Sequence, residues 1–152
     1  MPLYEKLYLL EDLINKDRNS LIIKIFIHPM QIGTIVKIAD NSGPMYLRVI
    51  KVLKKSSKSH PVIGDYIIGS VLRTHERKKF KVSKGSIVRA LVIRCAENYR
   101  RKDLTRLRFQ HPAAVIITKS GLPRATKIYG PIPKELRERG FIRIVSLSTI
   151  AL

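Results

Sequence analysis

The sequence predicts a mainly β protein: a small five-stranded antiparallel β-barrel with short C-terminal helices and an N-terminal extension. Three observations predict it. From residue 31 onward, about five short apolar runs alternate with turn signals over roughly 90 residues, and no helical pattern separates them. A helical pattern returns only near the C-terminus. The charge of residues 1–29 differs from that of all that follows, which separates an extension from the barrel.

The barrel strands are predicted from alternating or β-branched runs bounded by turn residues. Residues 40–44 (DNSGP) combine five strong turn formers and end the first run. In the second run Leu47 and Val49 alternate with Arg48, which predicts one buried and one exposed face. The five expected strands are residues 32–39, 46–53, 66–74, 86–95 and 113–118.

The C-terminal region carries the clearest helix signal. Pro133 suits the first helical position, residues 134–139 are good helix formers, and Gly140 suits the stop. A second short turn is expected over residues 148–152.

The first 29 residues are predicted to be a partner-facing extension, and residues 30–152 the working domain. Leu3, Leu7, Leu10 and Ile14 share one helix face, and residues 21–27 form a β-branched run typical of a strand. Four acidic residues in this segment argue against a cleavable mitochondrial presequence, which is normally poor in acid. We therefore expect the apolar face to pack on a neighbouring protein.

Composition excludes several classes of protein. The 152 residues carry a formal net charge of +19, and 45% are hydrophobic, so the chain can bury a core and needs an anionic partner. The single cysteine, Cys95, excludes a disulfide framework and a cysteine-rich zinc site, and we expect it to be a buried, inert thiol. No apolar run reaches the ~20 residues of a membrane span. These features indicate a soluble binder of a polyanion, with no membrane partner.

The charge is concentrated between residues 73 and 108, which hold 13 basic and 3 acidic residues. Within this range the first basic segment, residues 73–85, and the second, residues 97–109, each connect two predicted strands. Lysine and arginine in such segments neutralise phosphates and release counterions, which gives strong RNA binding without sequence specificity. The predicted RNA-binding residues are Lys51, Lys54, Lys55, Arg73, Arg77, Lys78, Lys79, Lys81, Lys84, Arg94, Arg100, Arg101, Lys102, Arg106 and Arg108, with Asn41 and Ser42 fixing the turn at the barrel edge.

No catalytic, cofactor or metal site is predicted. The four histidines lack the spacing of metal ligands, and no nucleophile, phosphate loop or paired carboxylates stand out. An RNA-modifying enzyme is therefore the minor hypothesis. Phe80, Tyr99 and Phe109 could stack on bases in a free OB-like single-stranded nucleic-acid binding module, the main alternative. Phe109, beside Leu107, is more typical of a core residue.

Five strings in order and spacing carry a family resemblance. They are residues 36–43 (VKIADNSG), 48–53 (RVIKVL), 81–94 (KVSKGSIVRALVIR), 128–131 (IYGP) before 135–137 (ELR), and 144–147 (IVSL). In this order they resemble the large-subunit ribosomal protein fourteen family across residues 30–152. Met30 falls where bacterial members begin.

The resemblance implies a five-stranded barrel bound to large-subunit rRNA at the subunit interface. It also implies contacts with neighbouring large-subunit ribosomal proteins and bridges to the small-subunit rRNA. Members of the family dock a ribosome-silencing factor that blocks subunit joining. The positions that match this docking face are Thr126, Lys127 and Arg143.

Two departures from the family pattern suggest a diverged organellar member. Asp103-Leu104 stands where the family has Asp-Gly, and residues 109–113 (FQHPA) replace a signature loop. With the extension, these departures favour a mitochondrial member over a bacterial or plastid one.

Overall fold

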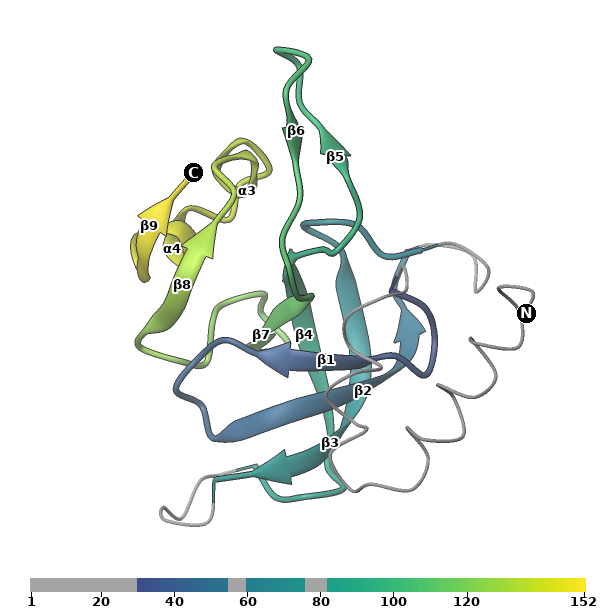
Figure 1. Cartoon of the computed structure of the whole chain (residues 1–152). Helices are drawn as coiled ribbons and strands as arrows, with labels where there is room; N and C mark the ends of the chain where they lie inside the picture. The colour runs from purple at the N-terminus through teal and green to yellow at the C-terminus, as the bar shows by residue number, and fades with distance from the viewer. Residues whose placement is uncertain (1–29, 55–59, 76–81) are drawn as a thin grey trace, which may run out of the picture.

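Five strands of the chain close into a barrel (Figure 1). The structure is a computed structural model, and it describes residues 30–54, 60–75 and 82–152. The predicted extension, residues 1–29, lies outside the described residues, as does Phe80. The same holds for five candidate RNA-binding residues: Lys55, Arg77, Lys78, Lys79 and Lys81.

The strands follow one another around the barrel in the order β1 (Ile35–Ile38), β2 (Pro44–Val52), β3 (Tyr66–Thr74), β4 (Ile87–Arg94) and β7 (Ala113–Ile117). Each overlaps one of the five predicted runs, so the prediction of a small five-stranded barrel is confirmed. Four of the pairings are antiparallel, and the closing pair, β1 with β7, is parallel. Side chains alternate with period two in parallel and in antiparallel strands alike. The sequence pattern therefore could not predict that the closing pair is parallel.

Inward-facing side chains of the barrel strands form the core. Val36, Leu47 and Ile67 are fully buried, because every second residue of a strand points to the same side of the sheet. Strands β2 and β3 approach so closely at Gly69 that a Cβ there would lie 2.5 Å from the Arg48 carbonyl oxygen. Only glycine fits this approach, which lets the two strands curve tightly into the barrel.

A two-stranded hairpin leaves the barrel between β4 and β7 and extends away from it (Figure 1). Its strands are β5 (Tyr99–Arg100) and β6 (Arg106–Leu107), which pair antiparallel. The sequence predicted a connection here, without strands, because two residues are too few for an alternating pattern. Most of the second basic segment lies on this hairpin.

The C-terminal residues form a small unit beside the barrel, made of β8 (Ile128–Ile132), α3 (Glu135–Glu138), α4 (Ile142–Ser146) and β9 (Ser148–Ala151). The predicted helix and its stop are confirmed, since α3 lies within residues 134–139 and Gly140 adopts a φ of +88°. The expected turn over residues 148–152 is wrong. Residues 148–151 form β9, which pairs parallel with β8. Strand β8 was not predicted.

Candidate nucleic-acid interface

The turn between β1 and β2 is built around the carboxylate of Asp40. The carboxylate accepts hydrogen bonds from the backbone N–H of Ser42, at 2.8 Å, and of Ile116 in β7, also at 2.8 Å. The Ser42 hydroxyl donates to it as well. Burial raises the pKa of the Asp40 carboxyl, although these hydrogen bonds act in the opposite direction. The bonds between Ser42 and Asp40 therefore hold the turn, and Asp40 also ties it to β7.

The side chain of Asn41 holds the segment that precedes β8. Its amide nitrogen donates to the Thr126 hydroxyl at 2.8 Å, and its amide oxygen accepts from the backbone N–H groups of Thr126 and Lys127, at 3.1 and 3.3 Å. Asn41 thus positions Thr126 and Lys127, two of the three residues predicted to face a silencing factor. Both are exposed, as is the third, Arg143 in α4.

Arg94, at the end of β4, fastens the C-terminal unit to the barrel. Its Nε donates to the Pro131 carbonyl oxygen at 2.6 Å, and its Nη2 donates to the Tyr129 carbonyl oxygen. Burial lowers the pKa of the guanidinium. Gly130, at a φ of +81°, lies directly against it, since a Cβ there would come within 2.8 Å of Arg94 Nη2. Arg94, which the sequence predicts to bind RNA, therefore also has a structural role: it holds β8 against the end of β4.

The tip of the hairpin is a tight turn with an unusual residue in it. Asp103 accepts hydrogen bonds from the backbone N–H and the hydroxyl of Thr105, at 3.1 and 2.6 Å, and these bonds lower the pKa of the Asp103 carboxyl. Leu104 then adopts a φ of +66°, a left-handed conformation that disfavours side chains with a Cβ. Leucine thus occupies the conformation that the family's usual glycine would suit.

The base of the tip is fastened to the C-terminal unit. The guanidinium of Arg101 forms an ion pair with Glu135 of α3 and donates to the Leu152 carbonyl oxygen at 2.9 Å. Lys102 Nζ lies 3.3 Å from a carboxylate oxygen of Glu138, but both side chains are exposed, so this pair contributes little. Arg101 is thus committed to internal contacts.

Arg100 and Arg106 lie directly opposite each other on the hairpin and are both exposed. The next pair, Tyr99 and Leu107, is half-buried and packs against the core. Two like charges opposite each other destabilise a pair of strands, and a phosphate between them would remove the repulsion. Arg100 and Arg106 therefore form an exposed pair of facing cations on the hairpin.

A row of cross-strand neighbours links the two basic segments around the barrel. In register, Arg73 of β3 lies beside Tyr46 of β2, which lies beside Lys37 of β1. Lys37 lies beside Ala113 of β7, which lies beside Arg94 of β4. Directly paired residues point to the same side of a sheet. The row therefore joins Arg73, where the first basic segment starts, to Arg94, which comes just before the second. It does so although the two segments are connected to opposite ends of β4.

The remaining described candidates are distributed over the surface. Lys51 on β2, Lys54 in the turn after it, and Lys84 before β4 are exposed. Arg108 is exposed too, and its Nε donates to the Ala96 carbonyl oxygen at 3.0 Å. None of these four residues belongs to the row or to the pair of facing arginines.

The two described aromatic residues proposed for the single-stranded binding module, Tyr99 and Phe109, do not form a stacking surface. Phe109 is 8% exposed and belongs to the core, as predicted, and Tyr99 packs against that core. Cys95 is buried, also as predicted, with its Sγ 3.6 Å from the Pro61 carbonyl oxygen. This placement disfavours the single-stranded binding module that would use Tyr99 and Phe109.

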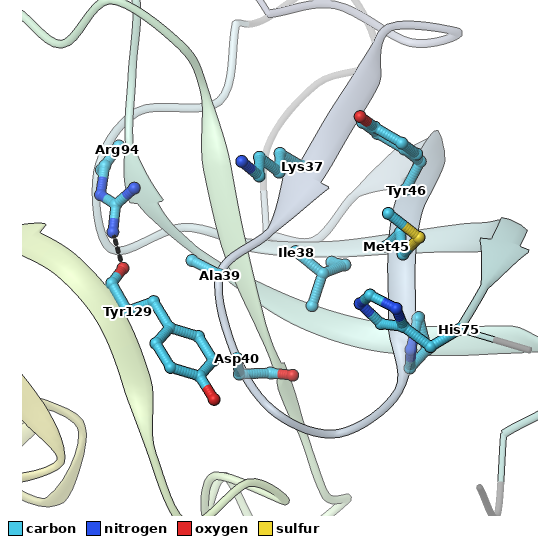
Figure 2. Close-up of a pocket in the computed structure, with 10 residues that line it drawn as sticks. Lys37, Ile38, Ala39, Asp40, Met45, Tyr46, His75, Arg94 and Tyr129 are labelled. Atoms are coloured by element: carbon cyan, nitrogen blue, oxygen red, sulfur yellow. Dashed lines mark hydrogen bonds between the residues drawn. The ribbon is translucent and has the colours of Figure 1, made fainter. Parts of the chain in front are cut away.

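A cavity of about 270 Å³ opens at the middle of the row (Figure 2). Its lining includes Lys37, Tyr46 and Arg94 from the barrel, His75 after β3, and Tyr129 from β8. The sequence analysis missed Lys37, Tyr46, His75 and Tyr129. Lys37 had a signal, since it holds the outward position between two apolar residues of its strand, whereas nothing in the sequence links Tyr129 to β1.

In the part of the chain that the structure describes, no group of three or more His, Cys, Asp or Glu side chains could hold a metal ion. Over the same residues, no helix is long and apolar enough to cross a membrane.

Comparison with known proteins places the chain in a family. A family model described as ribosomal protein L14p/L23e matches residues 29–152. The large ribosomal subunit protein uL14 of Petrotoga mobilis (strain DSM 10674 / SJ95) is 41% identical over 119 residues, which cover 78% of this chain and 96% of that protein. The match begins where the predicted extension ends. The chain therefore belongs to the ribosomal protein L14p/L23e family, and it is a structural component of the ribosome and not an enzyme.

Proposed function

We propose that this chain, a structural constituent of the large ribosomal subunit, binds large-subunit rRNA and contributes to bridges with small-subunit rRNA at the subunit interface. The observation that carries the proposal is the facing pair Arg100 and Arg106, on a hairpin that extends from the barrel (Figure 1). Neither arginine has an ion pair among the described residues: Glu135 and Glu138 lie against Arg101 and Lys102, and Asp103 at the tip accepts hydrogen bonds from Thr105.

The barrel wall supplies a second set of exposed cations. Lys37 and Arg73 belong to the row, and Lys51, Lys54 and Lys84 lie elsewhere on the barrel. Phosphate contacts of this kind fix position and orientation without reading sequence. We propose that the hairpin and the barrel wall contact different parts of the rRNA.

A binding experiment tests this proposal. The full chain and an Arg100→Gln/Arg106→Gln variant are titrated with a large-subunit rRNA fragment at several salt concentrations. Each lost phosphate contact should reduce the slope of log K against log salt by about one, so the double variant should lose about two. A Lys119→Gln/Arg124→Gln variant removes two exposed cations outside the proposed surface and should keep the original slope. An unchanged slope in the hairpin variant would remove the hairpin from the interface.

Co-sedimentation separates the proposal from the free-module alternative. A ribosomal protein remains with the large subunit through a moderate salt wash, whereas a free module is released. The matching family favours the first outcome.

Neighbouring large-subunit proteins and a silencing factor are proposed protein partners. Thr126, Lys127 and Arg143 are exposed, and Asn41 holds the first two in place, which supports a preformed face. Substituting Arg143 by glutamate should abolish pull-down of the silencing factor and leave rRNA binding intact, because Arg143 does not line the cavity beside Tyr129. The extension, residues 1–29, is proposed to pack on a neighbouring protein.

A mitochondrial location is also a proposal, supported by the extension and by the departures at Leu104 and residues 109–113. The relative named above is bacterial. Fractionation of the source cells, with detection of the chain in the mitochondrial or the cytosolic large subunit, tests it.

A further inference from the structure

The cavity at the middle of the row has the size and lining of a site for one planar group. Its volume, about 270 Å³, is close to the ~300 Å³ at which pockets begin to hold small molecules. Ile38, Ala39, Pro44 and Met45 form an apolar part of the wall. Tyr46 and Tyr129 add two aromatic rings from different elements, as Figure 2 shows.

The charge of the lining favours an anionic occupant. Lys37 and Arg94 contribute an ammonium and a guanidinium, and His75 contributes an imidazole. The one carboxylate in the lining, Asp40, is 8% exposed and accepts three hydrogen bonds from Ser42 and Ile116. Both carboxylate oxygens of Asp40 therefore already accept hydrogen bonds from the protein itself. No other carboxylate in the lining is available to pair with the cations that face the cavity.

Tyr129 is held in place from both sides of its backbone. Its N–H donates to the Ala39 carbonyl oxygen at 2.7 Å, and its carbonyl oxygen accepts from Arg94. Lys127 Nζ lies 5.8 Å from the centroid of its ring, within range of a cation–π contact. Tyr129 as a whole is nevertheless 53% exposed. Because its backbone is already fixed, only the side chain of Tyr129 has to be ordered when a partner binds to it.

We propose that this cavity receives one unstacked nucleotide of the rRNA, with its base against Tyr129 and the apolar wall and its phosphate at Lys37. The proposal deepens the proposed function and rests on it. A base has a flat apolar face, which suits the rings, and each base carries an attached phosphate, which suits the ammonium. The site would add recognition of an unpaired nucleotide to contacts that otherwise follow the RNA backbone.

Continuity with the basic row favours RNA over a protein segment as the occupant. Arg73 pairs with Tyr46 in register, so a strand of RNA that follows Arg73 and Lys37 passes the mouth of the cavity. An acidic protein side chain could pair with Lys37 but would leave the aromatic and apolar wall uncovered. A peptide is the competing occupant, and equal affinity for the two RNAs described next would overturn the nucleotide as the occupant.

The experiment compares two RNA hairpins with the same stem, one fully paired and one with a single bulged adenosine. Both are titrated by fluorescence anisotropy with the full chain. Stacking of one base should give the bulged hairpin about tenfold tighter binding. Lys37→Ala and Tyr129→Ala should each lose most of this preference, and Tyr129→Phe, which keeps the ring, should retain it.

Lys84→Ala is the matched control, because Lys84 is exposed and does not line the cavity. It should weaken binding of both hairpins equally. If the unaltered chain binds both hairpins with equal affinity and normal salt dependence, the nucleotide site is overturned and the rRNA function stands. If it binds neither, the proposed function itself fails. A preference that survives in both Lys37→Ala and Tyr129→Ala would also overturn the site, and Lys37, being exposed, can be replaced without disturbing the core.

Discussion

Two basic regions of this protein use arginine in opposite ways. On the hairpin, Arg100 and Arg106 are exposed and face each other without an internal partner in the described residues. On the barrel wall, Arg94 is half-buried and donates to the carbonyl oxygens of Tyr129 and Pro131. From this difference we expect exposed arginines to act mainly on RNA affinity and internally bonded arginines mainly on stability. Substitutions in the two regions should therefore separate stability from RNA affinity.

The largest effect on stability is expected from Arg94→Ala. The substitution leaves two backbone carbonyls without their charged donor and detaches β8 from the end of β4, so we expect a loss of about 2–4 kcal/mol in the free energy of unfolding. Urea denaturation measures it. Arg100→Ala is the control and should leave the midpoint unchanged. Equal midpoints for the two variants would abolish the distinction between the regions.

Asp40→Asn should have the next largest effect. An amide at this position keeps the shape of the side chain but offers one oxygen acceptor in place of two, so either the Ile116 or the Ser42 N–H loses its partner. An unsatisfied buried donor costs about 1–3 kcal/mol. The same denaturation experiment measures the loss. A variant as stable as the unaltered chain would show that the closure of β1 on β7 does not depend on this carboxylate.

Leu104→Gly addresses the hairpin and should have the smallest effect, in the opposite direction. Glycine relieves the left-handed strain of about 1–2 kcal/mol and adds about 0.5–1 kcal/mol of unfolded-state entropy, so a gain of roughly 0.5 kcal/mol is expected. Leu104 is 69% exposed, so little packing is lost. Affinity for rRNA should not change, since Arg100 and Arg106 are retained. A destabilised variant would show that the leucine side chain has a contact that outweighs the strain.

Much of the fold could be predicted because its strands are long enough to show a pattern. β3 occupies residues 66–74, as its run predicted, and α3 ends before the expected glycine. The hairpin strands contain two residues each, and β9 is a four-residue strand that pairs with β8. Such short segments take their structure from neighbours distant in the sequence, which a local pattern cannot show.

The sequence predicted which segment carries the basic residues but not which of these residues are exposed. The density of basic residues located the hairpin, but Arg100 and Arg101 are adjacent in the sequence and identical in type. What separates them is Glu135, which lies 34 residues beyond Arg101 and reaches it only in the folded chain. The cavity depends in the same way on Tyr129 lying beside Ala39.

The parallel pairing of β1 with β7 also has a consequence for folding during synthesis. The hydrogen bond between Asp40 and Ile116 joins residues 76 positions apart. The bond between Asn41 and Thr126 joins residues 85 positions apart. Contacts of such long range close slowly, because the loop entropy is lost before the contacts form. During synthesis, one edge of β1 therefore stays unpaired until β7 has been made. The barrel can close only late in translation.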